Sequence, residues 1–247
     1  MTGEGADDAR QVPCWGMLHA VLLLCVFVTA QVAFSVVFGQ MARGLTAHVL
    51  TGAATMAVQL PVTFSMVRRL AGGLPGAAER LGLRASRPGS FWRALGIAGA
   101  GALAFVAVGL AMVWLSQLAG RSADEFPAQP LARLISAQGP GWTLVAAAVL
   151  TTVGAPMTEE LLFRSVLYQP LRSRTGPVPA ALAIGVVFAL LHGYAWGLPQ
   201  LLVLSLVFTA LFEQTGSLWY PILAHGLYNG ITLVVVRAMS VPDFSAV

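Results

Sequence analysis

The sequence predicts an all-α membrane protein, a polytopic bundle of about seven to eight transmembrane helices, from three observations. Hydrophobic residues make up 57% of the 247 residues and charged residues only 10%, whereas in soluble domains apolar residues are near half and charged residues near a quarter. Several uncharged stretches reach the length of about 20 residues that a helix needs to cross a bilayer. The charges lie mostly between these stretches. These features exclude an ordinary soluble enzyme.

The uncharged stretches give the predicted helices in order along the chain. Each window between charged residues holds one helix, except that the window 174–213 is too long for one. It contains the segment 192–199, which is rich in helix breakers, so we divide it into two short helices. Seven helices result, and the segment 130–141 is the expected place of an eighth, as a surface helix or a re-entrant turn. The windows are 10–43, 43–68, 93–121, 133–159, 174–213 and 213–237.

The arginines predict how the bundle is oriented. Six of them lie within 68–93, and Arg172 and Arg174 mark a second basic loop. Loops rich in Lys and Arg stay on the cytoplasmic side, and the two helices between these loops allow both to lie there. We therefore expect a multi-pass protein of the bacterial plasma membrane with its N-terminus inside. The net charge of +4 comes from arginines that flank the membrane helices. They do not form the continuous basic surface that binds nucleic acid, so no nucleic-acid partner is expected.

Polar residues within the apolar runs of the C-terminal half are the candidates for a functional site. A charged side chain at the centre of a bilayer is unfavourable by about 2.5–3.5 kcal/mol on insertion scales, so such groups face protein or a wet cavity. In the first half, His19 and His48 stand alone near helix ends and are expected to be interfacial or core residues. The C-terminal set comprises Glu159, Glu160, Arg164, His192, His225 and Asn229.

Helical spacing sorts this set into faces. Glu160 and Arg164 are four residues apart in the order that favours an ion pair, and Glu159 projects about 100° away from them. The two acids could simply end the helix at the aqueous surface, but apolar residues continue for two further turns. Three helices that each offer a polar face predict one shared cavity. The second polar face carries Phe188 and His192, and the third carries His225 and Asn229, because the residues of each pair are four apart.

A carboxylate, two imidazoles and a carboxamide suit hydrolysis by an activated water molecule. Glu159 would take a proton from a water held with His192, while His225 and Asn229 donate hydrogen bonds to the oxyanion. Glu159, His192 and His225 could also bind a zinc ion, and spacing does not separate these two hypotheses. The motifs H-E-x-x-H and G-x-S-x-G are absent, which disfavours the usual zinc-protease helix and serine chemistry.

The polar residues form three short motifs in order along the chain. These are Glu159-Glu160-Leu-Leu-Phe-Arg164, Phe188-Ala-Leu-Leu-His192 and His225-Gly-Leu-Tyr-Asn229. They resemble the E-E-x-x-x-R, F-x-x-x-H and H-x-x-x-N motifs of the CPBP intramembrane proteases, which include the type II CAAX prenyl endopeptidases and the Abi proteins. The resemblance covers residues 156–230. It implies a CAAX-protease-like helical fold whose active site opens towards the cytoplasm.

The resemblance also implies roles and partners. The cofactor is either Zn²⁺ or another divalent metal, held by His192, His225 and Glu159, or none. The substrates are peptides or lipidated proteins at the membrane, including prenylated CAAX-type proteins. The roles are water activation by Glu159 and His192, stabilisation of the oxyanion by His225 and Asn229, and shaping of the site by Glu160, Arg164 and Phe188.

The chain is thereby divided into four parts: a tail at 1–14, N-terminal transmembrane helices at 15–125, a catalytic core at 126–240 and a tail at 241–247. Besides an intramembrane endopeptidase, two other functions fit such a chain. One is a non-catalytic membrane scaffold or partner-binding protein of the same fold. The other is a small transporter with a Glu and His proton relay, which the absence of internal repeats disfavours.

The predicted helices place the site residues at unequal depths. At about 1.5 Å per residue from the cytoplasmic helix ends, Glu159 and His192 fall roughly 15 to 20 Å deep, but His225 falls at about 10 Å. Unequal tilts, a kink at Pro156 or an earlier start of the last helix would bring them level.

Overall fold

A computed structural model describes residues 14–121 and 141–239, and in these ranges it contains helices and no strands. The chain folds into eight helices there when the continuous helix 141–175 is counted once. They are α2 (Met17–Met41), α3 (Gly44–Ala71), α4 (Leu74–Arg80), α5 (Ser90–Leu118), the long helix Gly141–Thr175, α10 (Pro177–Leu191), α11 (Leu198–Thr215), which follows the short turn η5 (Ala195–Gly197), and α12 (Trp219–Met239).

The predicted all-α membrane bundle is confirmed. Five helices are long and apolar enough to cross a membrane: α2, α3, α5, the long helix, and α11 with η5, while α10 is a shorter apolar helix. The long window divides as expected, because α10 ends at Leu191 and α11 begins at Leu198. The eighth helix is the short α4, in the arginine-rich loop. The expected place for it at 130–141 lies, apart from Gly141, outside the described residues.

The helix Gly141–Thr175 contains two π-helical segments. In the segments η3 (Leu150–Gly154) and η4 (Leu161–Tyr168) the backbone is wound as a π-helix, with hydrogen bonds from residue i+5 to residue i. Between them lies the α-helical turn α8 (Ala155–Glu160), preceded by α7 (Gly141–Val149) and followed by α9 (Gln169–Thr175). The helix therefore runs on past the two glutamates, as the apolar pattern predicted, and does not end at them.

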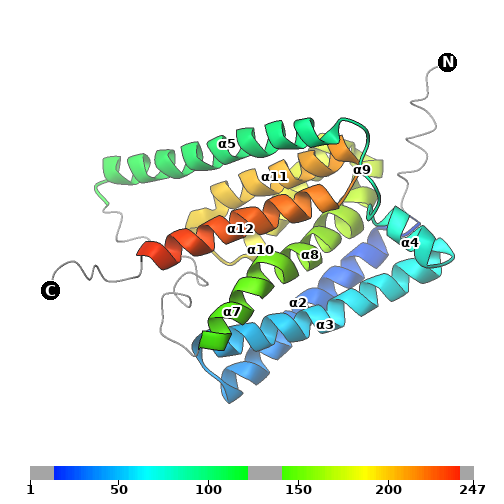
Figure 1. Ribbon diagram of the computed structural model, residues 1–247, viewed down its shortest axis with the longest axis horizontal. Helices are drawn as coiled ribbons and strands as arrows, with labels where there is room; N and C mark the ends of the chain where they lie inside the picture. The colour runs from blue at the N-terminus through cyan, green and yellow to red at the C-terminus, as the bar shows by residue number, and fades with distance from the viewer. Residues whose placement is uncertain (1–13, 122–140, 240–247) are drawn as a thin grey trace.

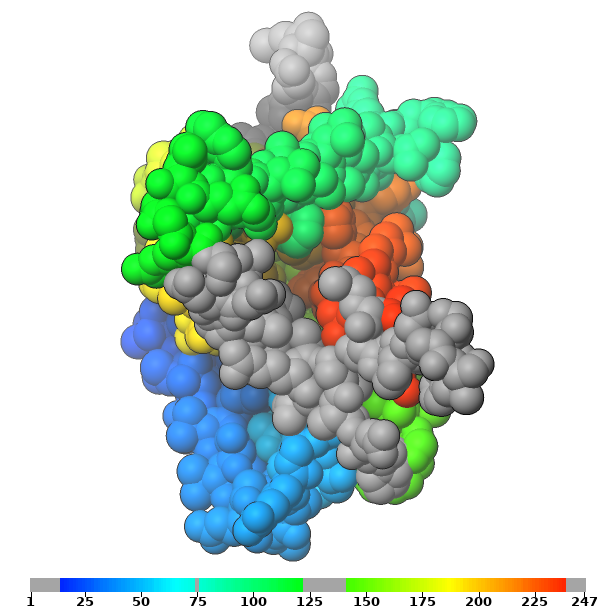
Figure 2. Space-filling view, turned by 90° about the vertical axis from the view of Figure 1, so that its left-hand side faces the viewer, coloured from blue at the N-terminus to red at the C-terminus, as the bar shows by residue number. Residues whose placement is uncertain are grey.

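The helices pack in two groups around the long helix (Figure 1). Helices α2 and α3 lie side by side against one face of it, and α10, α11 and α12 lie against another, with α5 outermost on α11. Figure 2 shows the end of α12 at the surface between α5 and the α2–α3 pair. Large hydrophobic side chains on α5, such as Leu103 (74% exposed), point outward, as expected for a surface that faces lipid.

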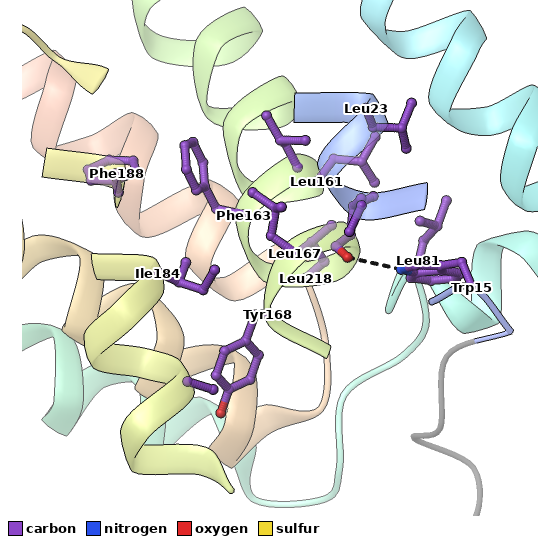
Figure 3. Close-up of a cluster of buried hydrophobic side chains, with 14 of the residues drawn as sticks. Trp15, Leu23, Leu81, Leu161, Phe163, Leu167, Tyr168, Ile184, Phe188 and Leu218 are labelled. Carbon is purple, nitrogen blue, oxygen red and sulfur yellow. Dashed lines mark hydrogen bonds between the residues drawn. The ribbon is translucent and has the colours of Figure 1, made fainter. Parts of the chain in front are cut away.

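The centre of the bundle is the segment η4, in which all eight residues are buried. Phe163 packs edge-on against Phe188 of α10 with ring centroids 5.1 Å apart, and Trp15 donates a hydrogen bond from Nε1 to the carbonyl of Val166 across 3.0 Å (Figure 3). Burial of these large side chains fixes the position of the helix immediately after the two glutamates.

The arginine-rich loop before α5 supports the start of α12. The backbone N–H of Leu218 donates to the Gly82 carbonyl at 2.8 Å, and the Ser217 hydroxyl donates to the Arg84 carbonyl at 2.8 Å. Arg84 in turn donates from Nε to the Gly216 carbonyl at 2.9 Å. These bonds set the point at which α12 enters the bundle.

Candidate active site

Three of the predicted site residues, from three parts of the chain, meet at one point. Oε2 of Glu159 lies 3.9 Å from Nε2 of His192 and 4.0 Å from Nε2 of His225. Glu159 belongs to α8, His192 follows the end of α10, and His225 belongs to α12. The side chains of Glu159 and His192 are 20% and 30% exposed, against 6% for His225. The structure therefore brings these three side chains together, with the Glu159 carboxylate near both imidazoles.

His192 is oriented by the helix that carries it. Its Nδ1 lies 2.7 Å from the Phe188 carbonyl one turn earlier. Because a carbonyl oxygen only accepts hydrogen bonds, Nδ1 must carry the hydrogen, so in the neutral ring Nε2 keeps its lone pair. The rings of Phe188 and His192 are 4.4 Å apart. The acceptor atom Nε2 is thus directed towards Glu159.

A second carboxylate orients His225. Its Nδ1 lies 2.8 Å from Oε1 of Glu160, whose side chain is fully buried. The imidazole also stacks on Phe208 of α11, with centroids 4.7 Å apart and planes inclined by 19°. A carboxylate that holds one ring nitrogen fixes the direction of the other, and here Nε2 is the nitrogen that faces Glu159.

Arg164 forms the predicted ion pair with Glu160. Its Nε lies 3.0 Å from Oε2 of Glu160, and both side chains are fully buried. One guanidinium nitrogen also donates to the Ser205 hydroxyl at 3.0 Å and to the Ser205 carbonyl at 3.2 Å. The guanidinium lies 5.0 Å and 5.3 Å from the ring centroids of Phe188 and Phe208. Ion pairing, hydrogen bonds and contact with aromatic faces together stabilise this buried cation.

Asn229 contacts the backbone of the long helix. It lies one turn after His225 on α12, as its spacing predicted, and its Nδ2 donates to the carbonyl of Thr151 at 2.9 Å. The side chains of Glu159, Glu160, Arg164, Phe188, His192 and His225 form one connected cluster, and Asn229 is joined to it through the backbone of η3 and α8.

Pro156 explains why the Thr151 carbonyl is available to Asn229. The backbone N–H of Ala155 donates to the carbonyl of Leu150, in the π-helical pattern. The next nitrogen belongs to Pro156 and carries no hydrogen, so the Thr151 carbonyl has no donor in that pattern. The Asn229 side chain supplies one. Pro156 therefore frees the Thr151 carbonyl, because its nitrogen cannot donate the hydrogen bond that the π-helical turn would otherwise make.

Gly226 allows α12 to approach this part of the helix. A Cβ atom at position 226 would lie only 2.4 Å from the carbonyl oxygen of Thr152, which is the carbonyl that an α-helix would pair with residue 156. Because no side chain is present, the backbone of α12 can pass directly over it. The close approach brings His225 and Asn229 to the long helix.

The three residues that could bind zinc are not arranged as a metal site. Among the described residues, no group of three His, Cys, Asp or Glu side chains is placed to hold a metal ion. Two ligands of a tetrahedral zinc ion, each about 2.1 Å from it, lie roughly 3.4 Å apart. The separations of 3.9 and 4.0 Å between Glu159 and the two histidines are wider than that, although the donor atoms are of the right kind. The zinc hypothesis for Glu159, His192 and His225 is not supported by this geometry.

Sequence reasoning missed two residues of α11, Ser205 and Phe208. Both are buried and contact the cluster through Arg164 or His225. A serine and a phenylalanine three residues apart on an apolar helix do not differ from ordinary core residues, so the sequence offers no signal that would select them.

Comparison with known proteins agrees with the motifs. Residues 141–231 match the family model "Type II CAAX prenyl endopeptidase Rce1-like". Over 91 residues the chain is 28% identical to "Putative membrane peptidase YdiL" of Bacillus subtilis (strain 168), an alignment that covers 37% of this chain and 36% of that protein's length. No solved structure matches the chain. The matched region contains every predicted site residue, and the resemblance is confirmed: residues 141–231 are similar to the Rce1-like type II CAAX prenyl endopeptidases.

Proposed function

We propose that the protein is an intramembrane endopeptidase in which Glu159 activates a water molecule for attack on a peptide bond. The observation that carries the proposal is the meeting of the Glu159 carboxylate with two imidazole nitrogens at 3.9 and 4.0 Å. These separations are too long for direct hydrogen bonds and suit one water molecule about 2.8 Å from each atom. The family match of the segment that holds all three residues supports peptidase chemistry.

In the proposed mechanism, Glu159 and His192 orient the water. The water donates one hydrogen to the Glu159 carboxylate and the other to Nε2 of His192, which is the acceptor nitrogen of that ring. Its lone pair is then free to attack the carbonyl carbon of the scissile bond. Glu159 takes the proton as the bond forms and passes it to the leaving amine when the C–N bond breaks.

His225 is the proposed donor to the oxyanion that forms in this step. Since its Nδ1 donates to Glu160, Nε2 carries a hydrogen when the ring is protonated. The second N–H of the Asn229 amide is proposed to assist as a further donor.

The proposed substrates are peptides or lipidated proteins at the membrane, with prenylated CAAX-type proteins as one class. We further propose a multi-pass location in the bacterial plasma membrane with the site open to the cytoplasm, which is supported by the arginines around the loop before α5. No step requires a metal ion. We expect elemental analysis of active protein to find no bound metal. We also expect treatment with a chelator to leave the peptidase activity unchanged.

Mass spectrometry of protein termini tests the proposal. Membranes that contain the wild-type protein should show new peptide termini that disappear with Glu159→Gln, because the amide cannot accept the proton. The variant should fold normally, since Glu159 is partly exposed and the change preserves its shape. Glu79→Gln, which changes an exposed acid on α4, is the matched control and should keep the new termini.

Two results would overturn the proposal. New termini that persist with Glu159→Gln would show that another group performs the cleavage. Identical termini with and without the wild-type protein would favour the non-catalytic scaffold instead.

A further inference from the structure

Helix α3 carries a buried stripe of polar residues that the proposed mechanism does not use. Its members are spaced four apart, so they lie on one face of the helix, and this face packs on the long helix that bears Glu159. Polar groups in a membrane helix are directed to protein partners because lipid cannot satisfy them. The stripe consists of Thr51, Thr55, Gln59 and Thr63, with exposed fractions of 5%, 3%, 2% and 0%.

Within this stripe, Gln59 is the residue that bonds to the site-bearing turn. Its Nε2 donates to the carbonyl of Thr158 at 3.1 Å, and Thr158 immediately precedes Glu159. Thr55 instead donates to Gln31 of α2 at 2.9 Å, and the Thr63 hydroxyl has no hydrogen-bond partner among the described residues. Of these residues, Gln59 therefore bonds to the helix that carries Glu159. Thr55 and Thr63, on the same face of α3, make no side-chain hydrogen bond to that helix and can serve as comparison positions.

The bond from Gln59 has a counterpart on the other side of α8. Asn229 of α12 donates to the Thr151 carbonyl, so carboxamides from two different helices hold the backbone before and within the turn that carries Glu159. Between the two points the winding changes from π to α and Pro156 removes a backbone donor. When the backbone hydrogen bonds within a helix are interrupted, hydrogen bonds from neighbouring helices contribute more to fixing how the helix is rotated about its axis.

We propose that Gln59 is a positioning residue for Glu159. Together with Asn229 it fixes the rotation of α8 and so keeps the Glu159 carboxylate opposite the two imidazoles. This inference rests on the proposed endopeptidase function and adds to it a residue outside the matched segment 141–231. It assigns the N-terminal helices a direct part in building the site.

Kinetics on a peptide substrate identified by the terminus analysis gives the first test. Gln59→Met keeps the length of the side chain and removes the donor, and Thr63→Val is the control on the same stripe. A shift of Glu159 by about 1 Å can lower the rate by roughly a hundredfold. We expect kcat to fall about tenfold to a hundredfold in Gln59→Met with KM unchanged, and Thr63→Val to keep the wild-type kcat. Equal kcat values in the two variants would overturn the inference.

Cross-linking gives a second test that needs no activity. Cysteines introduced as Glu159→Cys and His192→Cys, with Cys14 and Cys25 replaced by alanine, are joined by a short bifunctional thiol reagent. We expect the rate of cross-linking to fall severalfold when Gln59→Met is added and to stay unchanged with Thr63→Val. If Gln59→Met does not give folded protein, Gln59→Leu is measured in its place.

The two tests separate the inference from the function on which it rests. If no peptidase activity is found but Gln59→Met slows cross-linking, Gln59 still positions α8 and only the endopeptidase proposal fails. If activity depends on Glu159 but the cross-linking rate is the same in all backgrounds, the endopeptidase stands and the positioning role of Gln59 is wrong.

Discussion

At the scale of single residues, the site depends on a buried chain of polar contacts that runs from Arg164 through Glu160 to His225. The sequence predicted its first link, because two residues four apart on a helix are always neighbours. It could not predict the second link, since Glu160 and His225 are 65 residues apart in the chain and only the packing of α12 against α8 joins them. Local spacing therefore identified the residues but not the partner of each.

Arg164→Ala should destabilise the protein strongly. It leaves Glu160 buried beside His225 without its main counter-charge, and loss of one partner of a buried pair typically lowers the free energy of unfolding by about 3–5 kcal/mol. Thermal unfolding in detergent, compared with an exposed-site control such as Arg174→Ala, measures the loss. A variant as stable as the control would show that the Glu160 carboxylate is solvated.

At the scale of elements, the turn α8 that carries Glu159 lies between the two π-helical segments of the long helix. The sequence indicated this region through Pro156, and the structure shows that the helix continues through the proline instead of breaking there. The positions of η3 and η4 could not be predicted, because π-helical turns depend on contacts made by neighbouring helices. The polar stripe that includes Gln59 could not be predicted, since uncharged threonine and glutamine side chains do not stand out in an apolar helix as charged and histidine side chains do.

A double-mutant cycle tests the dependence of Asn229 on Pro156. Asn229→Ala should lower the free energy of unfolding by about 0.5–1.5 kcal/mol, the usual value of one hydrogen bond. In the background of Pro156→Ala the restored backbone N–H can satisfy the freed carbonyls, so the same substitution should be less destabilising. Denaturant or thermal unfolding of the four proteins gives the coupling energy, and additive effects would contradict the account of Pro156.

At the scale of the whole molecule, the order of the long apolar helices could be predicted because five of the six uncharged windows each hold one helix and the window 174–213 holds two, α10 and α11. The short α4 was not predicted, since its seven residues include Glu79 and Arg80 and form no apolar window. The division into tails, N-terminal helices and catalytic core stays a prediction.

The unequal depths predicted for the site residues came from the assumption that helix ends lie level. His225 is about 9 Å along α12 from Trp219, whereas Glu159 is about 24 Å from the end of its helix at Thr175, at 1.5 Å per residue. The structure nevertheless brings them together, since Oε2 of Glu159 lies 4.0 Å from Nε2 of His225. The start of α12 therefore lies deeper in the bundle than the end of the long helix.

Accessibility of introduced thiols tests the orientation. In a variant without Cys14 and Cys25, Ala85→Cys in the arginine-rich loop should react with a membrane-impermeant maleimide in inverted vesicles only. Met41→Cys, at the other end of α2 and 75% exposed, should react in right-side-out vesicles only. The reverse pattern would place the arginine-rich loop outside and contradict the positive-inside rule for this protein.

The short length of α10 affects the lipid around the site. Its 15 residues span about 22 Å, less than the hydrocarbon thickness of about 30 Å. Lipids beside it must compress to cover the end of the helix, where His192 lies, and such hydrophobic mismatch is relieved in a thinner bilayer. For the proposed endopeptidase we therefore expect peptide cleavage after reconstitution to be fastest in phospholipids with shorter acyl chains and to slow as the chains lengthen, so that membrane thickness would regulate this activity.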